Sequence, residues 1–563
     1  MGVTSPSAEA STRGGVRGWV GWLVRRPTVF GGLAVGLVFF WVSLTPSLLP
    51  RPWVVQGVVS GLTAAIGYGV GSGLSALVRA VLRREPGPAV KLWAWRVLVA
   101  VGVVGTALVM WWSKGWQNEL RRLVELEEES AFSFVGLLVI ALVTASIVLL
   151  MARLVRSLAR FLIRQIDRVA PRLVSVTVGV ALVFFIVIGL FQGFLWRGAI
   201  SFMNGVAGTT NGTTSDEAVR PTTALRSGGP GSGVPWDSLG RMGRDFVGQG
   251  PTVADLEKFH GPDCCQQPIR VYVGLDSAPT ADARAELAVR ELDRTGAFDR
   301  AVLGVFNATG TGWINPRVSD SLEYLYRGNT AEVSAQYSFL PSWLSFLVDQ
   351  TVAAETGRAF VGAVLRRVDQ LPAGHRPKVV LYGESLGSFA TEKSFDSMAQ
   401  LRARTDGAML VGPTFSNPLW QDLVAHREPG SPQWLPKVRE PGVRFARTPS
   451  DLEGFAASTS GARVVYLQNS SDPITWWSLD LAYRKPDWAG PPPAPDRSPA
   501  LRWFPLVTFW QIVADLTDSL GVPTGFGHHF GSNVVDGWVA VSTPDGWTAA
   551  DTARLKAVIG EGD

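Results

Sequence analysis

The pentapeptide GESLG at residues 383–387 places Ser385 at the centre of a Gly-x-Ser-x-Gly motif. A serine hydroxyl becomes an effective nucleophile only when a neighbouring base takes its proton. Small flanking residues permit the sharp strand-to-helix turn that presents this hydroxyl above a sheet. The bare motif is weak evidence in a chain with 61 glycines. Its context is stronger, because residues 378–382 predict a buried strand before the motif and a helix follows it.

The base for such a serine should come later in the chain, after an acidic residue. The chain has five histidines. His260 and His375 precede the serine, and His426 lies in an insertion after the next predicted strand. His528 and His529 follow the last core elements, in a glycine-flanked loop with the sequence GFGHH. We therefore predict that the base is one of these two residues, and the residues alone leave both open.

Asp472 is the predicted carboxylate that orients the base. It lies in a short turn after the predicted strand Arg463–Leu467, and acids of this kind follow a strand at the carboxyl edge of the sheet. The alternative role for an Asp-Pro pair is to cap a helix. The expected catalytic group is therefore Ser385, Asp472 and one of the two late histidines.

Two backbone N–H groups must stabilise the negative charge that forms when a carbonyl is attacked. Leu386 is predicted to supply one, because it directly follows Ser385 and opens a helix. The loop at 307–313 follows the predicted strand at 301–306 and has the glycines that such a loop needs. We assign the second N–H to Thr311. This loop lacks the Gly-Lys-Ser/Thr ending of a phosphate-binding loop.

The two cysteines of the chain, Cys264 and Cys265, are adjacent. Their spacing fits no zinc site, and we expect neither a metal nor a cofactor. A vicinal disulfide in an oxidising compartment and a pair of loop thiols are equal alternatives. Neither cysteine receives a catalytic role.

Strand and helix signals alternate from residue 268 onward. This alternation predicts a mostly parallel sheet with helices on both faces. The expected strands cover 269–275, 301–306, 378–382, 408–411 and 463–467. The expected helices cover 281–293, 351–371, the residues after 386, and 548–559. The Pro- and Trp-rich stretches 413–460 and 478–500 are expected to form lid-like insertions.

The N-terminal part of the chain is too apolar for an ordinary soluble domain. Hydrophobic residues make up 47% of the whole chain and charged residues 18%. Five segments approach the roughly 20 apolar residues that cross a bilayer: 29–49, 54–78, 95–112, 133–152 and 173–195. The predicted order is a cytoplasmic segment (1–28), an all-α transmembrane bundle of about five helices (29–196), a Gly/Ser/Thr-rich linker (197–267) and a catalytic domain (268–563).

Positive charges are concentrated in alternate loops between these segments. The positive-inside rule then places the N-terminus in the cytoplasm and everything after Trp196 outside the cell membrane, although one miscounted span would reverse this. The same arginines explain the net charge of +5, so nucleic acid is not an expected partner. The arginines between 153 and 168 have helical spacing, and either mark topology or bind anionic lipid headgroups.

Several motifs carry a resemblance as a set. They are IRVYVGL at 269–275, TGTGW at 309–313, QYS at 336–338 with PSW at 341–343, YGESLGS at 382–388, DP at 472–473 and the late Gly/His loop. This set resembles actinobacterial membrane α/β-hydrolases, which join a multi-span transmembrane domain to a C-terminal serine hydrolase domain. The late motif of that family is Gly-His-Gly-His, and here Phe526 replaces its first histidine. The resemblance thus implies His528, rather than His529, as the base.

The predicted reaction is the hydrolysis of a carboxylic ester through an acyl-enzyme. Ser385 attacks the carbonyl, His528 transfers its proton, and Asp472 holds the imidazole. A catalytic domain tethered at a membrane makes lipid or cell-envelope acyl esters the expected substrates and membrane lipids the expected surroundings. One alternative is an acyltransferase of envelope lipids that uses the same triad. The other is a non-catalytic membrane scaffold with a degenerate hydrolase domain.

Overall fold

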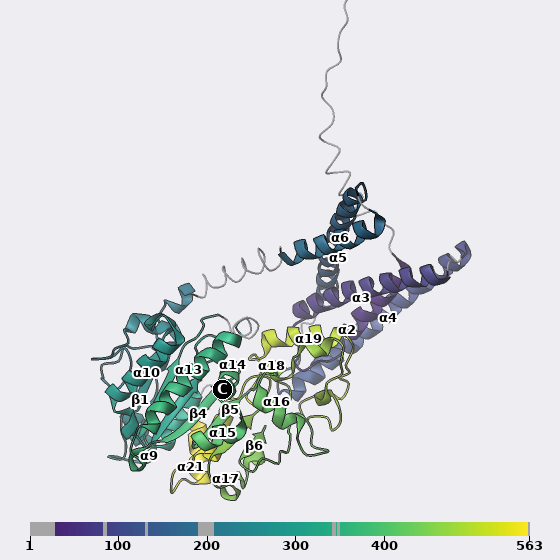
Figure 1. The fold of residues 1–563 in the computed structure, drawn as a ribbon. Coiled ribbons are helices and arrows are strands. Elements are labelled where there is room, and N and C mark those ends of the chain that lie inside the picture. Colours follow the sequence, from purple (N-terminus) through teal and green to yellow (C-terminus); the bar gives the residue numbers. More distant parts are fainter. Residues whose placement is uncertain are drawn as a thin grey trace, which may run out of the picture.

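The computed structural model describes residues 29–82, 87–129, 133–169, 171–189, 208–340, 345 and 350–560. The N-terminal helices, purple and blue in Figure 1, lie to one side of a sheet-containing body that the rest of the chain forms. Helix α19 (Val507–Asp515) of the sheet-containing body lies against the first N-terminal helices. This contact joins the two halves of the molecule.

Five helices make up the described N-terminal part. They are α2 (Phe30–Ser43), α3 (Trp53–Leu82), α4 (Pro88–Leu123), α5 (Phe134–Ile166) and α6 (Arg172–Ile188). Three of them, α3, α4 and α5, are long and apolar enough to cross a membrane. This finding is compatible with a membrane protein.

Of the five predicted spanning segments, the first forms a shorter apolar helix rather than one of spanning length. Helix α2 has 14 residues, a length of about 21 Å at 1.5 Å per residue, against roughly 30 Å of hydrocarbon. The segment 44–52 that follows contains three prolines, which cannot continue a helix. The last predicted segment extends beyond α6 into residues outside the described ones, so the orientation inferred from five spans stays a prediction.

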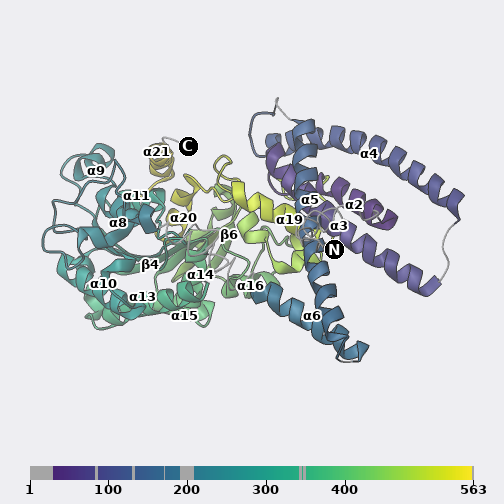
Figure 2. The ribbon, with the colours of Figure 1, turned by 90° about the horizontal axis from the view of Figure 1, so that it is seen from above.

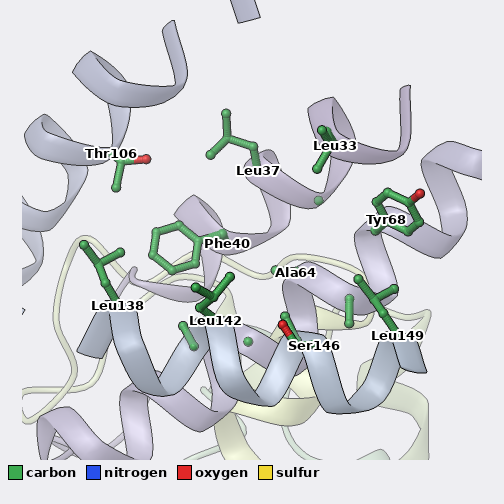
Figure 3. Close-up of a pocket in the computed structure, with 15 residues that line it drawn as sticks. Leu33, Leu37, Phe40, Ala64, Tyr68, Thr106, Leu138, Leu142, Ser146 and Leu149 are labelled. Carbon is green, nitrogen blue, oxygen red and sulfur yellow. The ribbon is translucent and has the colours of Figure 1, made fainter. Parts of the chain in front are cut away.

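Glycines of α3 allow close packing against its neighbours. A Cβ atom at Gly61 would lie 2.4 Å from the carbonyl oxygen of Ala141 in α5, and one at Gly71 would lie 2.1 Å from that of Gly31 in α2. Small residues let helices approach each other in lipid. A mainly apolar cavity of about 350 Å³ is nevertheless left among the helices α2 to α5 (Figure 3). Its lining includes Leu33, Phe40, Tyr68, Thr106, Leu138 and Leu149.

The C-terminal body is built on seven parallel strands in the order β1-β3-β2-β4-β5-β7-β6. They are β1 (Ile269–Val273), β2 (Val302–Asn307), β3 (Thr330–Ala335), β4 (Lys378–Glu384), β5 (Gly407–Val411), β6 (Val443–Ala446) and β7 (Arg463–Leu467). The prediction of a mostly parallel sheet is confirmed. Sequence analysis missed β3 and β6. Strand β3 reads as polar because it buries Glu332, which pairs in register with Arg270 of β1.

Helices cover both faces of this sheet, as Figure 2 shows. One face carries α10 (Ala281–Thr295), α13 (Gln350–Asp369) and α14 (Leu386–Lys393). The other carries α11 (Pro316–Leu325), α20 (Asn533–Val541) and α21 (Ala549–Ile559). Parallel strands are buried on both sides in this arrangement, which explains their continuous apolar runs.

Residues 208–267, expected as a loosely ordered connector, are folded against the sheet. They include α8 (Gly240–Gly248) and α9 (Val253–His260). The segment continues the hydrogen bonding beyond the edge strand β1, where Ser227 N donates to Arg270 O (3.1 Å) and Arg270 N donates to Leu225 O (3.3 Å). Cys264 and Cys265 form a disulfide, one of the two alternatives considered for them.

The two stretches predicted as lid-like insertions lie beyond the β5 side of the sheet. The first supplies α16 (Pro418–Ala425), the edge strand β6 and α17 (Phe455–Ser458), so part of it belongs to the sheet itself. Tryptophans of both stretches meet around Trp476, whose ring centroid lies 6.0 Å from that of Trp420 and 6.3 Å from that of Trp488. These insertions therefore have an aromatic core of their own.

Candidate active site

Ser385 occupies the turn between β4 and α14 by itself. Strand β4 ends at Glu384 and helix α14 begins at Leu386, which leaves the serine at φ 56° and ψ −123°. A non-glycine residue in this region is strained, and such strain is concentrated at functional sites. The Ser385 amide donates to the carbonyl oxygen of Val411 at the end of β5 (2.9 Å), which fixes the turn to the neighbouring strand.

The two glycines of the motif are required by close backbone contacts. A Cβ atom at Gly383 would lie 2.4 Å from the carbonyl oxygen of Gly387. One at Gly387 would lie 2.3 Å from the carbonyl oxygen of Asn307, the last residue of β2. Both distances are too short for a carbon and an oxygen atom, so the turn folds in this form only without these side chains. The motif therefore follows from packing as well as from chemistry.

His528 and Asp472 form a buried pair. The two atoms Nδ1 of His528 and Oδ2 of Asp472 are 2.7 Å apart, and neither side chain is more than 6% exposed. Asp472 is also the N-cap of the short helix α18 (Pro473–Trp476), because its Oδ1 accepts from the amide of Ile474 (2.8 Å). The two roles considered for Asp472 therefore coexist, one on each carboxylate oxygen.

The other ring nitrogen of His528 is available. When Nδ1 donates its proton to the carboxylate, Nε2 carries a lone pair and accepts. This buried Nε2 has no hydrogen-bond partner among the described residues. The imidazole also packs on Gly412, where a Cβ atom would lie 2.3 Å from Cε1 of His528. Since Gly412 follows the residue whose carbonyl holds Ser385, the end of β5 contacts both the serine and the imidazole.

Opposing effects determine the pKa of His528. Burial of the ring lowers the pKa, but the charge of Asp472, its hydrogen bond and the charge of Glu384 together raise it above the usual value. Glu384 is fixed in turn by hydrogen bonds from Tyr382 Oη and Asn315 Nδ2. The residue before the nucleophile thus contributes to the electrostatics of the imidazole.

His529, the alternative base, has a different environment. Its Nδ1 lies 2.8 Å from the carbonyl oxygen of Val522, and its own carbonyl accepts from the amide of Gly525 (2.8 Å). Both contacts stay within the loop. Of the two late histidines, only His528 makes a hydrogen bond to Asp472 in the described part of the chain.

Comparison with known families gives the fold its classification. Residues 269–555 match the model of an alpha/beta-hydrolase family, and residues 44–251 match the model of the N-terminus of that family. The chain belongs to the alpha/beta-hydrolase family. No curated protein and no solved structure was found to match it. Membership favours hydrolytic chemistry, and helices α3 to α6 and the sheet of this α/β-hydrolase fall within the family matches, whereas α2 precedes them.

The two predicted N–H donors for the oxyanion lie in neighbouring elements of the hydrolase, Leu386 at the start of α14 and Thr311 in the loop after β2. Leu386 opens α14, and the first amides of a helix have no partner within it. The loop after β2 is closed by a hydrogen bond from the amide of Thr309 to the carbonyl oxygen of Trp313 (3.1 Å), and the carbonyl of Thr311 accepts from Gln336 Nε2 (3.1 Å). Because β2 ends against Gly387, this loop begins beside the nucleophile turn. The assignment of Thr311 as the second donor stays a prediction.

Sequence analysis missed the residues that hold the loop around His528. Asn469 Nδ2 donates to the carbonyl of Gly527 (3.0 Å), and the amide of Gly527 donates to Ser471 Oγ (3.0 Å). Both side chains lie between β7 and Asp472 and are buried. The signal was present, because the polar run QNSSD directly after an apolar strand must find partners once it is buried.

Proposed function

We propose that this α/β-hydrolase is a membrane-anchored serine hydrolase of carboxylic esters. The observation that carries the proposal is the buried His528–Asp472 pair, whose imidazole packs on Gly412 directly after β5, the strand whose last carbonyl also holds the strained Ser385 turn. Nucleophile, base and orienting acid thus come from the carboxyl ends of strands and the late loop, in the order typical of this fold.

The mechanism follows from these positions. His528 Nε2 takes the proton of Ser385 as the hydroxyl attacks the ester carbonyl, and Asp472 stabilises the imidazolium that forms. The amides of Leu386 and Thr311 stabilise the oxyanion. His528 then protonates the leaving alcohol, which yields an acyl-enzyme. Water, activated by the same base, attacks the acyl-enzyme and releases the acid and free Ser385.

The proposed substrates are acyl esters of lipids or of the cell envelope. Three helices of spanning length and an apolar cavity among α2 to α5 support contact with acyl chains (Figure 3). In this proposal membrane lipids surround the N-terminal helices, the N-terminus is cytoplasmic and the catalytic domain is extracytoplasmic. Protease accessibility of the sheet-containing body in intact cells tests this orientation.

A fluorophosphonate probe on the full-length protein in detergent tests the proposal. The probe labels the native protein and fails to label Ser385→Ala, whereas Ser394→Ala serves as a matched control at the far end of α14 and is labelled normally. Hydrolysis of a short p-nitrophenyl ester follows the same pattern. A correctly folded protein that neither takes the probe nor cleaves esters contradicts the proposal and favours a scaffold. Product analysis with an added alcohol detects acyl transfer.

A further inference from the structure

Residues of the N-terminal half lie inside the core of the catalytic body. Segment 44–52, hereafter the α2–α3 loop, supplies Leu48 and Leu49, and the end of α4 is followed by Val124. All three are fully buried in the same apolar cluster as the strands of the sheet. A tether would leave the two bodies separate, whereas this packing makes the α2–α3 loop part of the hydrolase core.

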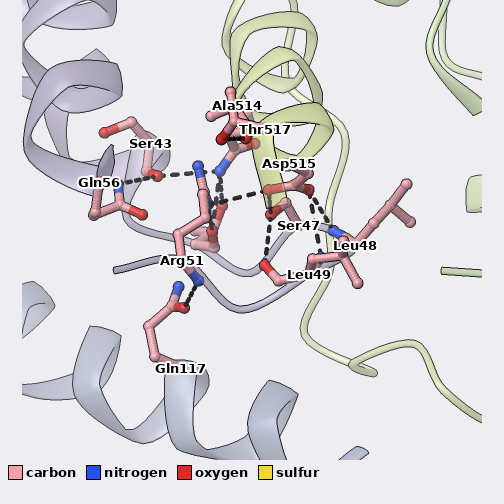
Figure 4. A network of polar contacts seen from close by, with 12 residues as sticks. Ser43, Ser47, Leu48, Leu49, Arg51, Gln56, Gln117, Ala514, Asp515 and Thr517 are labelled. Carbon is pink, nitrogen blue, oxygen red and sulfur yellow. Dashed lines mark hydrogen bonds and ion pairs between the residues drawn. The ribbon is translucent and has the colours of Figure 1, made fainter. Parts of the chain in front are cut away.

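A buried carboxylate fixes the α2–α3 loop to α19. Asp515, the last residue of α19, accepts hydrogen bonds from Ser47 Oγ (2.9 Å) and the amides of Leu48 (3.0 Å) and Leu49 (3.4 Å) (Figure 4). The guanidinium of Arg51 pairs with the same carboxylate at 3.4 Å. A buried charge without partners is costly, so α19 and the loop are held together.

One turn earlier in α19, a second side chain completes this contact. Gln511 Nε2 donates to the carbonyl oxygens of Ser43 (3.1 Å) and Thr45 (2.9 Å). The Ser43 carbonyl lies at the end of α2 and the Thr45 carbonyl in the proline-rich α2–α3 loop, where no intrahelical donors are available. The Ser43 carbonyl also accepts from Gln56 Nε2 (2.9 Å), so side chains of α3 and α19 meet at the end of α2.

The same segment of chain holds the base. The short helix η9 (Leu516–Asp518) follows α19 and leads to Ser519, whose carbonyl oxygen accepts from the amide of His528 (2.7 Å). Gly527 lies against this carbonyl and against Leu49, since a Cβ atom there would be 2.6 Å from Ser519 O and 3.5 Å from Leu49 Cδ1. The α2–α3 loop thus reaches the base loop both directly and through Asp515.

We propose that the α2–α3 loop positions the catalytic base, with Ser47, Arg51 and Asp515 as positioning residues. The inference rests on the proposed function, in which His528 is the base. It makes the N-terminal helices a working part of the enzyme in addition to an anchor. Displacement of a catalytic group by about 1 Å costs on the order of 100-fold in rate, so a shift of the base loop has a measurable effect.

The kinetic test uses the full-length enzyme in detergent and a short p-nitrophenyl ester. Asp515→Asn keeps the shape but removes the charge, and we expect kcat to fall by about 10- to 100-fold while KM changes by less than about threefold. Ser47→Ala, which removes one donor, has a smaller effect in the same direction. An unchanged kcat in both variants overturns the proposal.

Glu291→Gln on α10 is the matched control. Its carboxylate accepts from Ser232 Oγ (2.8 Å) and the amide of Gly233 (2.7 Å) and pairs with Arg294, much as Asp515 does with its partners. It lies on a helix packed against the edge strand β1. We expect this variant to lower stability with kcat unchanged. An equal loss of kcat in the control would reduce the Asp515 effect to general destabilisation and contradict the proposal.

Hydrogen exchange supplies a readout that needs no activity. In Asp515→Asn, peptides covering 519–530 exchange faster than in the parent protein, while those covering 383–393 are unchanged. Equal protection of 519–530 in both proteins overturns the proposal. If the parent protein cleaves no ester and takes no probe, the proposed function fails, and this measurement still decides whether the α2–α3 loop orders the His528 loop.

Discussion

Ser385 and His528 lie at one edge of the sheet but are held by very different parts of the chain. The serine is fixed by elements adjacent to it in sequence, with β4 on one side and α14 on the other. The histidine is fixed by three distant segments: the acid loop after β7, the end of η9 and the α2–α3 loop. The turn around Ser385 tolerates few substitutions at its glycines. The position of His528 depends instead on contacts from several separate segments.

This difference explains which half of the site a motif can reveal. A turn made by consecutive residues leaves a short pattern with fixed spacing, as in residues 383–387. A loop held by partners more than 50 residues away leaves no fixed spacing. The predictions below test whether the two parts of the site depend on the chain in these different ways, and they run from the largest effect to the smallest.

Separate substitutions of the two late histidines are expected to give the largest difference in kcat. His528→Gln is expected to lower kcat by roughly 10⁴- to 10⁶-fold, because no other group takes the serine proton. His529→Gln, its neighbour and matched control, changes a side chain that contacts the Val522 carbonyl rather than Asp472, and kcat falls by less than about tenfold. Steady-state ester hydrolysis measures both. Equal losses of kcat in the two variants would contradict the assignment of His528 as the base.

Asp472→Asn separates the two roles of that side chain. Activity is expected to fall by about 10³- to 10⁴-fold, since an amide cannot stabilise the imidazolium and favours the wrong tautomer. Stability changes little, because asparagine caps a helix as well as aspartate does. Measuring thermal unfolding and ester hydrolysis on the same variant separates the effect on stability from the effect on activity. A variant that unfolds and loses activity in parallel would leave Asp472 with a structural role alone.

Gly387→Ala tests the rigidity of the local part of the site. Its Cβ would meet the backbone oxygen of Asn307 at 2.3 Å, and we expect a loss of about 2–4 kcal/mol in the free energy of unfolding. Gly362→Ala in α13 is the control, because the only close atom there is the flexible guanidinium of Arg366 at 3.2 Å. Denaturant unfolding compares them. Similar free energies of unfolding for the two variants would show that the turn accommodates the added methyl group without loss of stability.

The pH dependence of kcat/KM tests the electrostatics around the base. Activity needs neutral His528, so it falls as pH drops through a pKa that Asp472 and Glu384 raise. Glu384→Gln moves this acid limb to lower pH, and the shift is smaller than for Asp472→Asn because Glu384 is the weaker cause. In the folded state the raised pKa means that protonated His528 adds stability below about pH 6.5, which is lost as pH rises through the folded pKa. If the acid limb of the pH profile does not move in Glu384→Gln, the carboxylate of Glu384 does not raise the pKa of His528.

The sequence supplied much of the sheet and the three groups of the proposed triad, because both rest on local signals. Strands β2, β4 and β7 are continuous apolar runs, and glycines mark the turns beside them. Strand β3 escaped notice because it buries Glu332, which lies in backbone register with Arg270 of β1, 62 positions earlier in the chain. The partners of the His528 loop escaped because they are distant in the sequence, since Asn469 and Ser471 lie 58 and 56 residues before Gly527.

The folded segment 208–267 has a consequence for the behaviour of the sheet in solution. An exposed edge strand offers free N–H and C=O groups on which other chains can pair and aggregate. Here Leu225 and Ser227 occupy these groups on Arg270 of β1, while the opposite edge strand β6 has only four residues. A fragment that begins at residue 269 would uncover β1, so the natural unit for recombinant production starts before residue 208.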